Sequence, residues 1–400
     1  MKFIHTSDWH LGQNLMDNKR REEHEKFLDW LLDYINQNEI DALVIAGDIF
    51  DSGTPPNYAL ELYYNFLYQL SLSECKQVII VGGNHDSPAT LNAPREILAA
   101  LNITVIPEGD KLKEEVIVVE DRVDPIAIFC AVPFLHDRVV RKSIPGQSYE
   151  EKSKALMEGI KQHYQQVAEL AQKRRKDLNT PDIPIIATGH LLTSHANTTD
   201  SEREIYIGNL SSSLSGSSFP DIFDYVALGH LHNSQIVEDN PNIRYAGSPI
   251  PLSFKEAGQE KKIFEIEIKD RENSVESITI PEYRKLRTVM SSLDELSERL
   301  DKIEKQENEL PPWLEIIITD NESGEFVNNE VHEIAQDFDL EILAVMHENK
   351  AEYENLSQED TEDLKHLDPE TVFKRRLENE EIEDEESLLN AFKEMLNQTL

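Results

Sequence analysis

Five short segments of this 400-residue chain combine aspartate, asparagine and histidine in a way that suits metal binding. Each follows an apolar, strand-like run. Their side chains offer imidazole nitrogens, carboxylate oxygens and one amide oxygen, without thiolate, and this mixture favours Mn²⁺, with Mg²⁺, Fe²⁺ and Zn²⁺ as alternatives. The segments are Ser7-Asp8-Trp9-His10, Gly47-Asp48, Gly83-Asn84-His85-Asp86, Gly189-His190 and Gly229-His230-Leu231-His232.

The spacing within these segments favours convergence on one site. In Asp8-x-His10 and His230-x-His232, the paired side chains leave the strand end on the same side. Glycine before a ligand permits a tight turn and a close approach of the metal. Seven candidate ligands exceed the needs of one ion, so the set predicts two metal ions about 3.5–4 Å apart, bridged by one carboxylate. Such a pair can clamp the attacking and leaving oxygens of a phosphoryl displacement.

Taken singly, each segment has a plainer explanation. Histidines stabilise structure more often than they bind metal, and Asn84-His85-Asp86 alone could form a turn. The ordered set of five, each after its own strand, makes the metal prediction specific. Elsewhere, we expect His5 to be a hydrogen-bonded core residue and His195 to lie on the surface.

Alternating strands and helices predict an α/β domain that positions these segments. Amphipathic patterns predict helices over Arg21–Gln37 and Asn57–Leu72, and later strands are expected at Lys262–Lys269 and Val275–Ile280. Near-continuous apolar runs predict strands that are buried on both faces. These runs are Lys2–Thr6, Ala42–Ala46, Val78–Val81, Ile126–Val132, Ile183–Thr188 and Tyr225–Leu228.

Secondary-structure patterns continue beyond this first domain. After a helix over Leu293–Lys305, a strand–helix–strand run predicts a small α/β capping domain, with elements at Trp313–Thr319, Glu325–Phe338 and Leu340–Met346. A polar, acidic stretch then leads to two amphipathic C-terminal helices that open at Asp368 and Ser387. The predicted domains are therefore residues 1–275, 276–350 and 351–400.

The formal charge of −38 argues against a protein that coats nucleic acid by bulk electrostatics. The last hundred residues hold 30 Asp and Glu against 8 Lys and Arg. Local basic groups would therefore have to hold a DNA phosphate. The candidates are Lys19-Arg20-Arg21, Arg138 with Arg141-Lys142, Arg174-Arg175-Lys176 and Arg284-Lys285-Arg287. With no apolar run near the ~20 residues of a membrane span and no visible signal peptide, we expect a cytoplasmic protein without a membrane partner.

The five segments resemble the calcineurin-like metallophosphoesterase superfamily in order and spacing. This resemblance implies a four-layer α-β-β-α sandwich that holds two metal ions. It places Asp8, His10 and His232 on one ion. It places Asn84, His190 and His230 on the other, with Asp48 bridging. By the same resemblance, His85 is not a ligand but faces the scissile phosphate, where it stabilises charge or protonates the leaving oxygen, while a metal-bound water attacks in line.

Further matches narrow the resemblance. Protein phosphatases of the superfamily carry arginine where this chain has Ser52 and glutamate where it has Asp86, and the missing arginine clamp favours a phosphodiester substrate. Longer stretches resemble the SbcD family of nuclease subunits. They are His5 to Gly12, Gly83 to Pro88, Ser201 to Glu204, Tyr225 to His232 and Tyr245 to Pro249.

The resemblance to the SbcD family implies a Mn²⁺-dependent double-strand exonuclease and single-strand or hairpin endonuclease in DNA end processing, repair and recombination. Its expected partners are DNA and an SbcC-type coiled-coil ATPase that the C-terminal helices bind. None of the 15 glycines is followed by lysine, so the chain has no Walker A loop of its own. A homodimer is expected through the apolar helix Asn57–Leu72 and its neighbour Pro88–Leu101, giving a heterotetramer with the ATPase.

Two other functions stay open at this point. A stand-alone phosphodiesterase acting on small esters would need neither a cap nor tail helices. A scaffold that keeps the fold without the metals would not need all seven ligand positions and His85. Cleavage of an aryl phosphodiester but not of DNA would favour the first alternative, and a lack of bound metal would favour the second.

Overall fold

Two six-stranded sheets carry the metal-binding segments in the computed structural model, which describes residues 1–141, 149–194, 202, 214–269, 272–303, 310–319, 325–347 and 388. The first sheet has the order β14-β13-β1-β4-β5-β6, in which the last four strands are parallel and the first two antiparallel to their neighbours. Its strands are β1 (Lys2–Thr6), β4 (Ala42–Ala46), β5 (Gln77–Val81), β6 (Ile103–Ile106), β13 (Lys262–Lys269) and β14 (Glu272–Thr279).

The second sheet has the order β11-β12-β10-β9-β8-β7. Its four central strands are parallel, and the hairpin partners at both edges are antiparallel. The strands are β7 (Val116–Asp121), β8 (Asp124–Cys130), β9 (Ile185–His190), β10 (Tyr225–Gly229), β11 (Gln235–Val237) and β12 (Asn240–Tyr245). Parallel strands place their carboxyl ends at one edge, which is where ligand sites form in α/β sheets.

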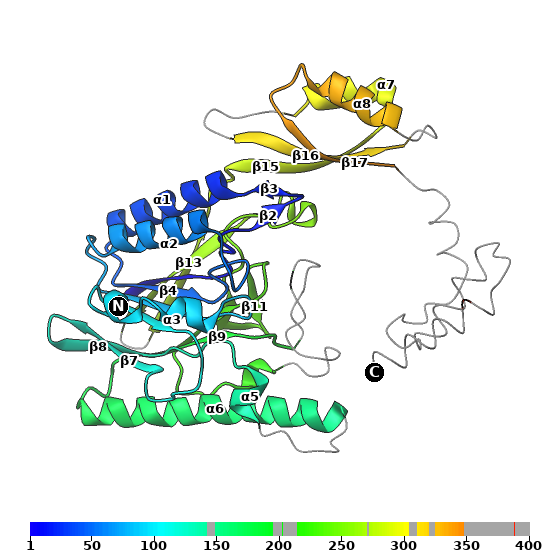
Figure 1. The fold of residues 1–400 in the computed structure, drawn as a ribbon. Helices are drawn as coiled ribbons and strands as arrows, with labels where there is room; N and C mark the ends of the chain where they lie inside the picture. Colours follow the sequence, from blue (N-terminus) through cyan, green and yellow to red (C-terminus); the bar gives the residue numbers. More distant parts are fainter. Residues whose placement is uncertain are drawn as a thin grey trace. The chain divides into compact units, whose positions relative to one another are not determined.

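Successive residues of the central strands point to opposite faces, and both faces are apolar. Phe3 and Phe129 pack between the two sheets, whereas Ile4 faces helices α1 (Arg21–Gln37) and α2 (Asn57–Leu70). The outer face of the second sheet packs against the 29-residue helix α6 (Tyr149–Asp177). Figure 1 shows α1 and α2 over one sheet and α6 beyond the other. The predicted four-layer sandwich is therefore confirmed.

One expected helix is divided into two in the structure. The predicted helix at Pro88–Leu101 is two short helices, α3 (Pro88–Asn92) and α4 (Arg95–Ala99), which Ala93 and Pro94 separate. Proline lacks the amide hydrogen that a continuing helix needs, and it disfavours helical geometry in the residue before it. The other short elements are β2 (Asn14–Leu15), β3 (Asn18–Lys19), α5 (Asp137–Val140) and the 3-10 turns η2 (Gly216–Ser218) and η3 (Phe254–Glu256).

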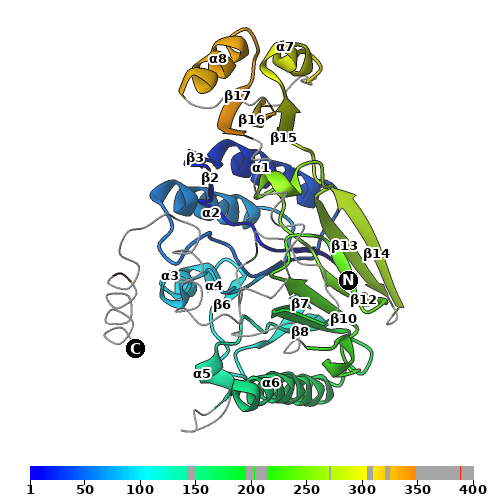
Figure 2. The same ribbon diagram turned by 90° about the vertical axis from the view of Figure 1, so that its right-hand side faces the viewer.

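A separate three-stranded parallel sheet follows, with the order β15-β16-β17. Helices α7 (Leu293–Asp301) and α8 (Glu325–Ala335) lie on the face of this sheet that points away from α1 (Figures 1 and 2). The sequence patterns had located β16 (Leu310–Ile318), α8 and β17 (Glu341–His347) but not β15 (Arg284–Ser291). The predicted C-terminal helices lie outside the described residues, except for Leu388. In the parts that are described, no helix is long and apolar enough to cross a membrane.

Candidate metal centre

All eight predicted site residues lie at the carboxyl ends of parallel strands and come together there. Asp8 and His10 follow β1, Asp48 follows β4, and Asn84 and His85 follow β5. From the second sheet, His190 ends β9, and His230 and His232 follow β10. The amide of His230 donates to the Asp8 carboxylate across the two sheets, over 2.8 Å. Residues separated by more than two hundred positions therefore share one buried cluster.

Potential ligand atoms form two compact groups. One group contains Asp8, His10 and His232, and the other contains Asp48, His190 and His230; within each group the ligand atoms lie within 4.8 Å of one another. All six residues are buried. Asn84 joins the second group, because its side-chain oxygen lies 2.9 Å from Nε2 of His190. These groups match the two ligand sets that the family resemblance implies; which atoms bind metal stays a prediction.

Asp48 lies between the two groups. Its Oδ2 is 3.3 Å from Nε2 of His190 and 3.7 Å from Nε2 of His10. Its Oδ1 accepts the amide hydrogen of His85 over 2.9 Å. One carboxylate therefore faces an imidazole from each group, as a bridging ligand would.

Hydrogen bonds to the backbone fix two of the rings. Nδ1 of His190 lies 2.9 Å from the carbonyl oxygen of Ala46, and Nδ1 of His85 lies 2.7 Å from that of Asp51. Because a carbonyl only accepts, Nδ1 must carry the hydrogen in both rings, which leaves Nε2 as the nitrogen that can act as a ligand or base.

The backbone that presents these side chains is strained. Asp8, His10, Asp48 and His230 have φ angles of 52°, 46°, 49° and 105°, in the region that non-glycine residues seldom adopt. Gly83 lies so close to Asp48 that an added Cβ would overlap its carboxylate. Strain of this kind persists where the surrounding structure holds it and is typical of functional sites.

Buried charges perturb the pKa values of the cluster. Burial raises the pKa of Asp48, but the charges of His190 and His10 outweigh it and hold this pKa well below its usual range. Burial lowers the pKa of His190, but the Asp48 carboxylate outweighs burial and raises it to about 9. Burial keeps the pKa of His230 well below its usual value. Asp48 and His190 thus form an ion pair, and a cation can replace the imidazolium proton.

Two divalent cations fit this donor set. Both ring nitrogens of His10 are buried and have no hydrogen-bond partner, although carboxylates lie 3.4 and 3.7 Å away. Buried polar atoms are rarely left in this state unless something else satisfies them. Imidazoles and carboxylates without thiolate are ligands for Mn²⁺ and similar divalent ions.

The sequence patterns did not single out Asp51. Its Oδ1 lies 3.4 Å from Nδ1 of His10, and together with His85 these residues form a third group of potential ligands. This group shares His10 with the first one. Asp51 stands three residues after Asp48, so its proximity depends on the turn that follows β4 rather than on a strand-end motif.

Asp86 also has a role that the sequence did not reveal. Its buried carboxylate accepts the amide hydrogens of Ile49, Phe50 and Gly83, at 2.9–3.1 Å. These bonds tie the turn after β4 to the turn after β5. Asp86 therefore fixes the relative positions of Asp48 and Asn84.

Comparisons with known proteins agree with this geometry. The model of the calcineurin-like phosphoesterase family matches residues 1–234, and that of the type 5 capsule protein repressor C-terminal domain matches residues 282–381. The SbcD subunit of nuclease SbcCD from Escherichia coli (strain K12) is 37% identical over 385 residues, which cover 96% of this chain and 94% of the relative. The chain belongs to the SbcD family of calcineurin-like phosphoesterases.

Other members of the SbcD family are more distant. The protein of Bacillus subtilis (strain 168) is 30% identical over 275 residues, 68% of each chain. That of Rhodobacter capsulatus is 33% identical over 269 residues, 64% of each chain. Both are named as the SbcD component of nuclease SbcCD.

Two arginines of the basic groups that were predicted to hold phosphate are wrong candidates. Arg20 and Arg284 are buried and pair with Glu23, with nitrogen–oxygen distances of 2.7 and 3.1 Å. They therefore stabilise the interior and cannot contact a substrate from the surface. Arg138 pairs with Glu108. Arg174 and Lys176, at the end of α6, are exposed and stay candidates.

His5 behaves as expected of a core residue. Its ring nitrogens lie 3.1 Å from the Tyr225 hydroxyl and 3.1 Å from the carbonyl oxygen of Leu228. It thus joins the two sheets beside the metal centre. The predicted surface residue His195 lies outside the described residues.

Proposed function

We propose that this chain is the nuclease subunit of a DNA end-processing complex and hydrolyses phosphodiesters with two divalent metal ions, preferably Mn²⁺. The convergence of two buried ligand groups on Asp48 supports this proposal most strongly. Membership of the SbcD family supports the choice of DNA as the substrate.

In this proposal, Asp8, His10 and His232 would hold one ion, and Asn84, His190 and His230 would hold the other. The Asp48 carboxylate would be a ligand of both. When bound, such a pair neutralises phosphate charge and makes water a stronger nucleophile at neutral pH. The protein's contribution is to hold the ligands in place, through strained turns and through the hydrogen bonds of His190 and Asp86.

His85 is proposed to protonate the leaving oxygen. Its ring lies 4.7 Å from the ring of His10, at the border of the ligand cluster. The carbonyl oxygen of Asp51 orients it, with Nδ1 as the donor. To act as the acid, His85 must carry a second proton on Nε2, and this proton would pass to the leaving oxygen.

We also propose a role for each domain of the chain. Residues 1–275 would form the nuclease domain and 276–350 the cap, while residues 351–400 would bind an SbcC-type coiled-coil ATPase in the cytoplasm. A chain truncated after about residue 360 should keep metal-dependent cleavage of single strands. It should lose co-purification with the ATPase and ATP-driven activity on duplex ends.

A homodimer through α2 and the α3–α4 segment is also proposed. Most of the apolar surface of α2 is used within the chain, because Tyr63, Phe66 and Leu67 are buried. Tyr68 and Ile97, in contrast, expose 57% and 70% of their surfaces on α2 and α4. These exposed apolar side chains support the interface, and a monomeric mass at micromolar concentration would contradict it.

The test is digestion of end-labelled duplex and hairpin DNA with Mn²⁺, with Mg²⁺ and without metal. Each reaction is run with and without an SbcC-type ATPase and ATP. We expect Mn²⁺-dependent cleavage, with exonuclease action on duplex ends that requires the ATPase. Cleavage of an aryl phosphodiester combined with no cleavage of DNA under any condition would support a small-ester phosphodiesterase instead.

A further inference from the structure

A buried Glu–Lys pair stands directly behind one predicted metal ligand. The carboxylate of Glu256, in η3, is completely buried, and its Oε1 lies 3.6 Å from Nδ1 of His232. Its Oε2 accepts from Nζ of Lys261 over 2.6 Å and from the amide of Leu252 over 3.2 Å. Nothing in the five sequence motifs pointed to either residue.

Lys261 contacts the backbone of His232 as well as Glu256. It is only 7% exposed, and its ammonium group also donates to the carbonyl oxygen of His232 over 3.0 Å and to Oγ of Ser248 over 2.9 Å. The pair therefore contacts both the ring and the backbone of His232. A buried ion pair usually contributes little to stability compared with apolar packing, so stability alone is a weak reason for this one.

The chemistry of metal-bound histidine gives a stronger reason. A ligating imidazole commonly has its other ring nitrogen next to a carboxylate, which fixes the ring orientation and makes the ligand more basic. Nδ1 of His232 faces Glu256, which leaves Nε2 as the nitrogen that would bind a cation. The geometry points to Glu256 as a positioning residue for His232. Lys261 neutralises the charge of the Glu256 carboxylate. This inference rests on the proposed metal binding.

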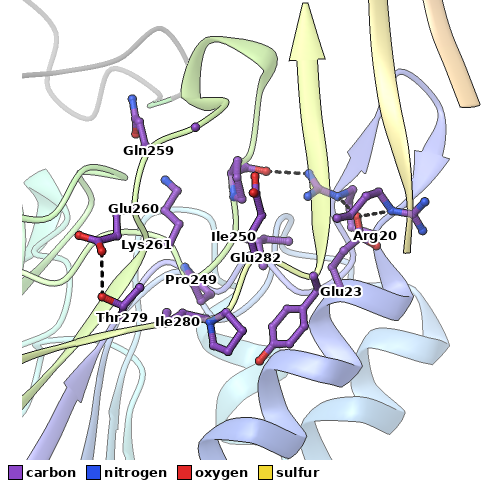
Figure 3. A pocket seen from close by; sticks show the side chains of 15 residues that line it. Arg20, Glu23, Pro249, Ile250, Gln259, Glu260, Lys261, Thr279, Ile280 and Glu282 are labelled. Atoms are coloured by element: carbon purple, nitrogen blue, oxygen red, sulfur yellow. Dashed lines mark hydrogen bonds and ion pairs between the residues drawn. The ribbon is translucent and has the colours of Figure 1, made fainter. Parts of the chain in front are cut away.

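The surroundings allow a conservative test of the lysine. The stem of Lys261 lines a cavity of about 270 Å³, which Figure 3 shows together with Arg20 and Glu282. Methionine in place of Lys261 keeps an unbranched side chain beside this cavity and removes the ammonium group. Glu256→Gln likewise keeps the shape of the side chain and one acceptor oxygen.

The experiment is a calorimetric Mn²⁺ titration of chelator-treated full-length protein. The variants are Glu256→Ala, Glu256→Gln and Lys261→Met. Glu260→Gln is the matched control, because Glu260 is an exposed glutamate of the same segment that pairs with Lys262. Thermal unfolding without metal is measured for every variant.

We expect wild type and control to bind two ions. Glu256→Ala should lower the affinity for one of the two Mn²⁺ ions by about 10–100-fold and leave the affinity for the other unchanged. Glu256→Gln and Lys261→Met should give smaller losses of affinity for the same ion. Should Glu256→Ala not fold, these two variants carry the test.

Two outcomes overturn the inference. Unchanged affinity of both ions in the Glu256 variants would show that the carboxylate does not position His232. If the variants lost affinity for both ions equally, in proportion to their loss of thermal stability, Glu256 would have a merely structural role. If wild type itself bound no Mn²⁺, the proposed function would fail instead, so the two failures are distinguishable.

Discussion

Two clusters of buried charged side chains in this protein manage their charge in different ways. At the junction between α1 and the cap, Arg20 and Arg284 share the Glu23 carboxylate and lie 5.5 and 4.3 Å from the ring centre of Trp313. The metal centre instead buries Asp8 and Asp48 among imidazoles, two nitrogens of which have no hydrogen-bond partner.

The two clusters also differ in backbone conformation. The metal centre holds four residues at positive φ, whereas Arg20 at the cap junction has an ordinary φ of −91°. Both clusters keep buried polar atoms without a hydrogen-bond partner: Nη2 of Arg20, Oε2 of Glu23 and Nε of Arg284 at the junction, and both ring nitrogens of His10 at the metal centre. The strained backbone therefore distinguishes the metal centre from the junction, and strain of this kind is expected where a cluster serves function.

The largest effect is expected from removing the carboxylate between the two ligand groups. Asp48→Ala should abolish hydrolysis, a loss of at least about 1,000-fold, because several kcal/mol of charge stabilisation depend on the metal pair. Cleavage rates and Mn²⁺ content are measured together, with the exposed cap residue Glu295→Ala as control. An Asp48→Ala variant with near-normal activity would contradict the comparison.

His85→Leu separates catalysis from metal binding within the same cluster. The variant should lose about 10²–10⁴-fold in activity, because a general acid contributes that much, while both ions remain bound. Metal analysis of the purified variant is the check. Loss of one ion would instead assign His85 to the third ligand group, with His10 and Asp51.

At the cap junction, the expected effect is on stability and not on metal. Glu23→Ala leaves Arg20 without its carboxylate and Arg284 with only the exposed Glu22, which should cost about 3–5 kcal/mol of unfolding free energy. Urea unfolding with and without Mn²⁺ measures this loss, with the exposed Glu25→Ala on the same helix as control. The loss should be equal under both conditions; dependence on Mn²⁺ would show that the clusters are coupled.

The smallest effect concerns pH. Because the pKa of His190 is raised from 6.5 to about 9, its pairing with Asp48 stabilises the apo protein fully below about pH 6.5 and is lost as pH rises through 9. Mn²⁺ must displace this proton, so Mn²⁺ affinity should rise with pH over the same window, by about tenfold per unit at most. Thermal unfolding of apo and Mn²⁺-loaded protein from pH 6.5 to 9 tests both signs. A rise of apo stability across that window would contradict this account.

Local sequence patterns were enough to predict the elements that carry the predicted ligands. The ligand motifs stand directly after apolar strands, so strand, turn and ligand could be read together, and α1 and β13 have the predicted bounds. Helix α6 was missed, although Leu156, Ile160, Tyr164 and Val167 recur at helical spacing, because the polar residues between them mask the stripe.

Contacts between distant segments could not be predicted in this way. Glu256 and Lys261 meet His232 only after the segment beyond β12 folds back, and no spacing rule connects them. Arg20 and Arg284 seemed to belong to surface charge runs, yet Trp313 and Glu23 bury them. Charge alone does not separate a buried cation from an exposed one; only the fold does.

The central claim is that two metal ions share the carboxylate of Asp48. The most direct measurement is electron paramagnetic resonance of the Mn²⁺-loaded protein, combined with metal counting. We predict two Mn²⁺ per chain with a spin-coupled signal, and loss of that coupling in Asp48→Asn. A single Mn²⁺ per chain, or two ions without coupling in the wild type, would contradict the account.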